Sequence, residues 1–330
     1  MKKFVILLMV LGLFACNNDN KTTKTAESKK EKKTVIVPVF NADSAYRYVK
    51  KQIDFGPRVP ESKAHEQCAE WLVSMLDGFS DTVYVQNFRT RLFDGRGIDG
   101  KNIIGVFNPD AKKRIVLAAH WDTRPYADAD PDRANWNTPI DGANDGASGV
   151  GVLLEIARQL HNRKIDDKIG VDIVLFDLED YGAPSFSQYN TEDSWCLGSQ
   201  YWSKYPHKNN YSAYYGILLD MVGVSDPSFP KEYYSQQFAP DISNKVWRVA
   251  RGMGYDMHFS NELGHPITDD HYYMNKIAGI PTINIIHLEF DSPNGSFYEH
   301  WHTLKDDIES IDPKSLDMVG NVVLNVIYNE

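Results

Sequence analysis

The chain has 330 residues, of which 35 are Lys or Arg and 45 are Asp or Glu, and its formal net charge is −10. Hydrophobic residues make up 42% of it, and it holds three cysteines. These values exclude a small disulfide scaffold, a collagenous or low-complexity chain, and a nucleic-acid binder that works through a basic face.

Residues 1–15 carry two lysines followed by an apolar run that is too short for a transmembrane helix. This pattern predicts a secretory signal peptide. The segment 13–16, Leu-Phe-Ala-Cys, resembles the lipobox of bacterial lipoproteins, which implies cleavage before Cys16 and acylation of that cysteine. We therefore expect an exported lipoprotein, anchored in a membrane and facing the periplasm or the cell surface. An ordinary signal peptide with an incidental cysteine is the alternative.

Residues 16–36 are expected to form a disordered, Lys-rich tether, because they contain too few apolar side chains to offset the entropy of ordering. Residues 1–34 hold eight of the 35 basic residues and three of the 45 acidic ones, so the remainder carries a net charge near −15. This acidic body argues against a nucleic-acid partner.

Strands and helices are expected to alternate along residues 37–330. Residues 55–62, FGPRVPES, are rich in Pro and Gly and predict a loop between the first two helices. The predicted strands are 81–88, 102–107, 114–119, 171–178, 215–222 and 282–288. The predicted helices are 41–53, 60–76, the run VGVLLEIARQL at 150–160, a helix that starts within 198–205, 242–252 and 313–327.

This alternation predicts an α/β fold with a central mixed, mostly parallel sheet flanked by helices. No linker-like composition interrupts residues 37–330, so a single domain is expected. Cys68 and Cys196 are left once Cys16 is assigned to lipid, and they either pair or both stay buried as thiols.

Acids and histidines follow the predicted strands, at the end of an open sheet where ligands gather. Clustered carboxylates repel one another unless a cation or proton intervenes, so a divalent metal explains them best. A mixture of carboxylates and imidazole suits catalytic zinc, whereas an all-oxygen site would suit calcium or magnesium. The candidates are His120, Asp122, Asp145, Glu179, Asp180, Asp220, Asp269, Asp270, His271, His300 and His302.

Other catalytic arrangements find little support in the sequence. Residues 146–151, GASGVG, match neither a nucleophile elbow nor a dinucleotide fingerprint. No HExxH sequence or P-loop is present, and neither Cys68 nor Cys196 has an activating context.

Ordered motifs over residues 40–330 resemble the superfamily shared by zinc-dependent aminopeptidases and animal-type glutaminyl cyclases. They are HWDT (120–123), GANDGASGVGVLLEIAR (142–158), FDLEDYG (176–182), CLGSQYW (196–202), LLDMVG (218–223), ITDDH (267–271), GIPTINI (279–285) and WHT (301–303). The resemblance implies one aminopeptidase-like α/β domain with a zinc site above the strand ends.

Details of these motifs distinguish the two branches. Trp301 before His302, and Asp269 before Asp270 and His271, look like the cyclase, whereas GANDGASG looks like the peptidase. Asp180 stands where both branches usually have Glu, and it resembles bacterial members of the cyclase branch. We therefore favour a glutaminyl-peptide cyclotransferase, which converts an N-terminal glutamine of peptides or proteins to pyroglutamate and releases ammonia.

The resemblance also implies roles for individual residues. Asp145, Asp180 and His302 would bind one zinc per chain, and Glu179 would be the general base and acid. Asp220 and Asp269 would complete an acidic network, while Trp301 and Phe297 would form the wall of the substrate pocket. One alternative is a two-zinc aminopeptidase with His120 as a ligand, and another is a non-catalytic lipoprotein that binds peptides.

Overall fold

The structure is a computed structural model that describes residues 35–189 and 193–330. The predicted signal peptide, Cys16 and the tether up to residue 34 lie outside the described residues. Residues 35–330 form one compact unit. No helix among the described residues has both the length and the apolar character needed to cross a membrane.

One mixed sheet is the centre of this unit, with the strand order β1-β2-β4-β3-β5-β6. Its strands are β1 (Thr82–Arg91), β2 (Gly97–Phe107), β3 (Lys113–His120), β4 (Ile169–Phe176), β5 (Tyr215–Asp220) and β6 (Thr282–Ile286). β2 pairs antiparallel with β1 and with β4, whereas β4, β3, β5 and β6 pair parallel. The expected α/β domain with a mixed, mostly parallel sheet is confirmed.

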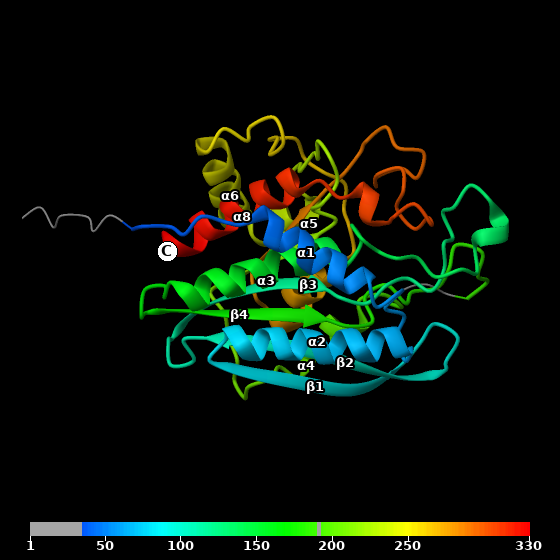
Figure 1. The fold of residues 1–330 in the computed structure, drawn as a ribbon, viewed down its shortest axis with the longest axis horizontal. Helices are drawn as coiled ribbons and strands as arrows, with labels where there is room; N and C mark the ends of the chain where they lie inside the picture. The colour runs from blue at the N-terminus through cyan, green and yellow to red at the C-terminus, as the bar shows by residue number, and fades with distance from the viewer. Residues whose placement is uncertain (1–34, 190–192) are drawn as a thin grey trace, which may run out of the picture. The chain divides into compact units, whose positions relative to one another are not determined.

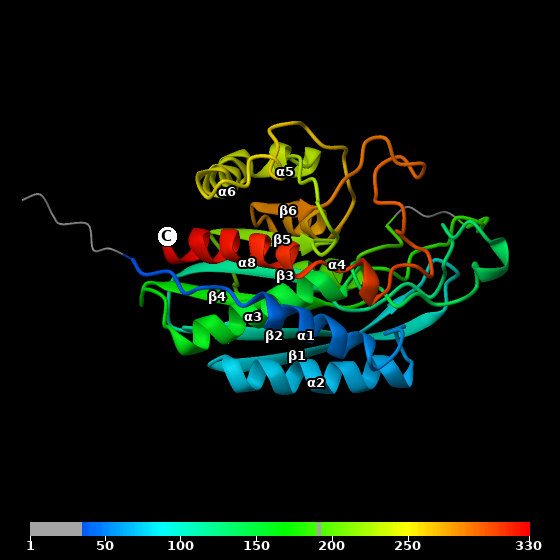
Figure 2. The same ribbon diagram turned by 45° about the horizontal axis from the view of Figure 1, so that its top comes forward.

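Helices cover both faces of the sheet (Figures 1 and 2). They are α1 (Ala42–Ile53), α2 (Lys63–Phe79), α3 (Ala147–Asn162), α4 (Leu197–Lys204), α5 (Tyr233–Phe238), α6 (Pro240–Gly252), α7 (Asp270–Tyr273) and α8 (Pro313–Tyr328), with single turns η1 (Arg133–Asn135), η2 (Met274–Ala278) and η3 (Ile308–Ser310). On one face, α1, α2, α3, α6 and α8 share the larger apolar core with the sheet. On the other face, α4 and η2 pack through Trp202 and Met274.

Helix starts follow from local capping. Asn41 and Ser62 accept hydrogen bonds from backbone N–H groups in the first turns of α1 and α2, and Asp312 does the same for α8. α2 begins at Lys63 and not at residue 60, because Ser62 is its cap. The short helices α5 and α7 were not predicted, since four to six residues are too few for a periodic pattern.

Three strands end earlier than their apolar runs predict. β4 stops at Phe176, β5 at Asp220 and β6 at Ile286, each two residues before the expected end. Leu178 and Met221 have φ values of 56° and 47°, in the left-handed region that non-glycine residues rarely adopt. These turns take the chain out of the sheet where the acidic residues are placed.

Gly149 gives a test of how closely α3 approaches the sheet. A β-carbon at this position would lie 2.3 Å from the Leu219 carbonyl oxygen on β5. Gly149→Ala is therefore expected to lower the free energy of unfolding by about 1–3 kcal/mol, measured by chemical denaturation. Gly78→Ala is the matched control, because nothing lies within 4 Å of its added β-carbon in α2. The control should gain up to about 1 kcal/mol, and equal stability of both variants would contradict the packing argument.

Candidate metal and catalytic site

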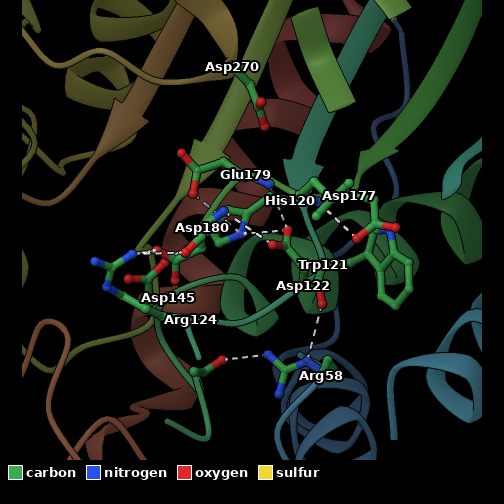
Figure 3. A network of polar contacts seen from close by, with 12 residues as sticks. Arg58, His120, Trp121, Asp122, Arg124, Asp145, Asp177, Glu179, Asp180 and Asp270 are labelled. Carbon is green, nitrogen blue, oxygen red and sulfur yellow. Dashed lines mark hydrogen bonds and ion pairs between the residues drawn. The ribbon is translucent and has the colours of Figure 1, made fainter. Parts of the chain in front are cut away.

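Three neighbouring parallel strands deliver polar groups to one edge of the sheet. β3 ends at His120 and β5 at Asp220, while β4 is followed by the turn at Leu178 and then by Glu179 and Asp180. The register of the parallel pairs brings these ends level with one another. Figure 3 shows the side chains of His120, Glu179 and Asp180 gathered at this edge. The predicted strand-end cluster is therefore a real assembly in space.

Asp145, Asp180 and His302 form a buried trio whose ligand atoms all lie within 4.8 Å of one another. His302 Nε2 is 3.2 Å from Asp180 Oδ1 and 3.6 Å from Asp145 Oδ2. Both carboxylate oxygens of Asp180 are buried without a hydrogen bond from any described residue. Burial and then the charge of Asp145 raise the pKa of Asp180. Arg124 Nη1 lies 3.6 Å from Asp180 Oδ1, which is beyond hydrogen-bond range, so its charge compensates the buried carboxylate only in part. Two carboxylates and one imidazole arranged in this way fit a zinc ion.

The ring of His302 is held by groups on both sides. Its Nδ1 lies 3.3 Å from Asp128 Oδ1, which leaves Nε2 facing the trio. Arg124 makes two hydrogen bonds of 2.8 Å to the Asp128 carboxylate. Burial alone would raise the pKa of Asp128, but hydrogen bonds from Arg124 and His302 outweigh it and hold the pKa below its usual range. The ring of Trp301 stacks on the imidazole at a centroid distance of 3.5 Å. A carboxylate that orients a histidine from behind is typical of metal ligands.

His120, Asp145 and Asp220 form a second buried trio that shares Asp145 with the first. His120 Nε2 lies 3.1 Å from Asp145 Oδ1 and 3.3 Å from Asp220 Oδ1. Its Nδ1 is buried without a hydrogen-bond partner among the described residues. Asp122 Oδ1 faces this nitrogen at 3.7 Å, which is an ion-pair distance and longer than the 3.3 Å between His302 Nδ1 and Asp128. His120 is therefore supported by a carboxylate less closely than His302 is.

Glu179 belongs to a buried acidic network on the other side of His120. Burial raises the pKa of Glu179 well above its usual range, and the charge of Asp269 adds to the rise against the opposing charge of His120. Burial also raises the pKa of Asp220 to about 7. Asp269 accepts a hydrogen bond of 2.6 Å from the Asn284 amide. A carboxyl group with a pKa of about 7, such as Asp220, can exchange protons near neutral pH.

Two further carboxylates hold the backbone of the site and were not assigned roles from the sequence. Asp122 accepts hydrogen bonds of 3.1 Å from the backbone N–H groups of Glu179 and Asp180. Asp306 accepts those of Asn144 and Asp145, at 2.8 and 3.0 Å. Both loops that present the acidic side chains are therefore fixed by fully buried carboxylates.

A cavity of about 340 Å³ opens onto these groups. All eight side chains expected from the sequence line it, namely Asp145, Glu179, Asp180, Asp220, Asp269, Phe297, Trp301 and His302. Phe297 stacks on Trp301 at 4.5 Å, and Trp195 closes another part of the wall. His271 does not join this group, because its Nε2 binds Glu232 at 3.0 Å.

The comparisons with known proteins agree with this geometry. Residues 102–327 match Peptidase family M28. The chain belongs to this family. This M28 chain is 28% identical over 256 residues to the glutaminyl-peptide cyclotransferase of Bos taurus, in an alignment that covers 67% of the chain and 64% of that relative. It therefore spans less than two thirds of the length of that curated relative.

Solved structures resemble the M28 chain over nearly its whole length. A glutaminyl cyclase of Bacteroides thetaiotaomicron bound to N-acetylhistamine is 51% identical with a TM-score of 0.87, covering 89% of this chain and 100% of the other. A Zn-dependent exopeptidase of Parabacteroides distasonis ATCC 8503 is 50% identical, with the same TM-score and coverage. Both branches expected from the motifs are thus represented among similar structures.

Sequence reasoning missed several residues that support the M28 site. Asp122 lies two residues after His120 in the HWDT motif, so its position beside the site could be predicted. Its hydrogen bonds to the backbone of Glu179 and Asp180 could not. Arg124, Asp128 and Asp306 lie in loops with no periodic pattern. Cys68 and Cys196 are both buried and free, which settles the open question of their pairing. The predicted lipidation of Cys16 lies outside the described residues.

Asp128→Asn tests the support of His302. The amide keeps the size of the side chain but removes the charge that orients the imidazole, so zinc affinity should fall by about 10- to 100-fold. Competition with a chelator measures this change. Asp99→Asn is a suitable control, because Asp99 is an exposed partner of Arg89. Equal zinc affinity in wild type and Asp128→Asn would contradict the assigned role.

Proposed function

We propose that the protein is a glutaminyl-peptide cyclotransferase that converts an N-terminal glutamine to pyroglutamate and releases ammonia. One observation carries the proposal. A largely buried carboxyl with a raised pKa, Glu179, shares a cavity of about 340 Å³ with a metal-binding trio behind an aromatic wall. This is a small site suited to one side chain and to proton transfer. The likeness to glutaminyl cyclases of known structure supports the same conclusion.

Asp145, Asp180 and His302 are the residues that would hold zinc. When bound there, zinc would act as a Lewis acid that polarises the γ-carbonyl of the glutamine. We propose one zinc per chain, because Asp128 supports His302 Nδ1 at 3.3 Å, whereas Asp122 lies 3.7 Å from His120 Nδ1 and makes no hydrogen bond to it.

Glu179 would move the proton that the reaction requires. The α-ammonium of the substrate must lose a proton before its nitrogen attacks the γ-amide carbon, and the departing ammonia must gain one. A largely buried carboxyl with a raised pKa can accept the first proton and return it. Asp220 and Asp269 place further carboxyl groups beside this path, and a cationic substrate would favour their charged form.

The aromatic wall would favour cyclisation over hydrolysis. Trp301 and Phe297 pack against each other and against the apolar cluster of Met221, Ile267 and Tyr298. A wall of this kind can hold the glutamine methylenes and exclude water from the γ-carbonyl. No attacking water is needed for ring closure.

A two-zinc aminopeptidase is the second candidate function. The trio of His120, Asp145 and Asp220 offers ligand atoms within 4.8 Å of one another, and a similar structure is a Zn-dependent exopeptidase. The predicted export, and the lipid anchor on Cys16, stay predictions from the sequence, and the proposed reaction does not depend on them.

Substrate assays distinguish the two candidates. With a Gln-initiated peptide, the protein should release one ammonia per peptide and leave a product without a free α-amine, as mass spectrometry and amine labelling would show. Glu179→Gln should lower kcat by about 10²- to 10⁴-fold, because the amide cannot carry the proton. A shortened peptide with a new free amine, from either Gln- or Leu-initiated substrates, would instead establish the aminopeptidase.

Histidine variants test the number of metal sites. In the one-zinc account, His302→Ala should lose bound zinc, while His120→Ala should retain the same zinc content as wild type. Elemental analysis after dialysis gives both values. Loss of half the wild-type zinc in each variant would show that both trios bind metal.

A further inference from the structure

Cys196 is a buried thiol beside the proposed proton carrier. It comes directly before α4, and its backbone has a φ of 57°, in the left-handed region. No part of the residue is exposed to solvent. Strained backbone conformations often occur at functional sites, and the contacts of Cys196 indicate its role there.

The segment around Cys196 is joined to the Glu179 loop at three points. The Cys196 N–H donates to the Glu179 carbonyl oxygen, and the Leu197 N–H donates to that of Leu178, both at 2.9 Å. The third contact is made by the side chain, because Cys196 Sγ donates to Glu179 Oε1 at 3.1 Å. The two backbone hydrogen bonds therefore hold the thiol next to the Glu179 carboxylate, to which it donates the third.

This segment is itself fixed to the sheet. The Asn102 side chain on β2 donates to the Gly198 carbonyl oxygen at 2.9 Å and accepts from the Asp177 N–H at 3.0 Å. Gly198 approaches so closely that an added β-carbon would overlap the Asp177 carbonyl oxygen. The sulfur therefore sits on a rigid support and not on a mobile loop.

We propose that Cys196 is a positioning residue, whose thiol fixes Oε1 of Glu179 and thereby fixes the direction of the proton-carrying carboxylate. The inference rests on the proposed function, in which Glu179 carries the proton. It adds a role for a cysteine that has no activating context in the sequence.

A thiol is chemically suited to this role. The S–H group is a weak, uncharged donor, so it can orient the carboxylate without the strong attraction that a lysine or arginine would exert. Burial and the charges of Glu179, Asp270 and Asp269 raise the pKa of the Cys196 thiol well above its usual range. The sulfur keeps its proton and remains a donor.

The other oxygen of the carboxylate is held less tightly. Glu179 Oε2 lies 3.9 Å from His120 Nδ1, beyond hydrogen-bond range. With Oε1 bound to the thiol, Oε2 is the oxygen that is available to exchange a proton. Without the thiol, the carboxylate could rotate and leave the reactive geometry, which a shift of about 1 Å is enough to disturb.

Three variants test the proposal in the zinc-loaded protein. Cys196→Ala removes the donor, Cys196→Ser replaces it with a hydroxyl, and Cys68→Ala removes a second fully buried thiol that lies in the larger apolar core. Cys196→Ala should lower kcat for a Gln-initiated peptide by about ten-fold and leave KM within about two-fold. Cys196→Ser should recover most of the lost kcat, and Cys68→Ala should keep the wild-type kcat. The zinc content should be the same in all of them.

Two kinetic results would overturn the proposal. One is a wild-type kcat in Cys196→Ala. The other is a loss of kcat that Cys68→Ala shares or that accompanies loss of zinc, since both would show a general structural effect. If the wild type itself releases no ammonia from the peptide, the proposed function fails, and this assay separates that failure from a failure of the positioning role.

Infrared spectroscopy of the S–H stretch tests the contact independently of activity. The wild type should show a hydrogen-bonded S–H band that disappears in Cys196→Ala and persists in Cys68→Ala. The same band should shift in Glu179→Gln, because the amide oxygen is a weaker acceptor than a carboxylate. A band that is unchanged by Glu179→Gln would overturn the assignment.

Discussion

The repulsion among buried carboxylates at the ends of β3, β4 and β5 is the constraint on which the site depends. Asp145, Asp180 and Asp220 are all buried and share imidazole neighbours, and Glu179 and Asp269 lie beside them. Such a cluster is costly in a protein interior unless protons or cations compensate for it. Raised pKa values at Glu179 and Asp220 show one form of compensation, and a metal in the trio with His302 is the other.

The surrounding structure keeps these groups close in spite of that cost. The carboxylates of Asp122 and Asp306 bind the backbone of the loops that present them, and the Arg124–Asp128 pair holds His302 from behind. The turns at Leu178 and Met221 take up left-handed conformations that only strong surrounding contacts would maintain. Much of the fold near the strand ends therefore serves to hold repelling groups in one place.

The sequence predicted the sheet and the members of the cluster because apolar runs followed by acids are visible in a linear pattern. For this reason the pattern predicts Asp180 and Asp220 at the same end of the sheet. The contacts of Arg124, Asp128 and Cys196 were not predictable, since they depend on how irregular loops cross in space. The early ends of β4 and β5 were also missed, because Leu178 and Met221 carry no glycine signal for a left-handed turn. The family resemblance implied the roles of the metal-binding and catalytic residues. The geometry showed which residues hold them in place.

Zinc titration of the metal-free protein tests the central claim most directly. If the repelling carboxylates are the constraint, zinc should raise the unfolding temperature, because an ion that binds only the folded state stabilises it. Titration calorimetry on the same sample should give a stoichiometry of one zinc per chain. An unfolding temperature that does not respond to zinc, or a calorimetric stoichiometry of two zinc ions per chain, would contradict the account.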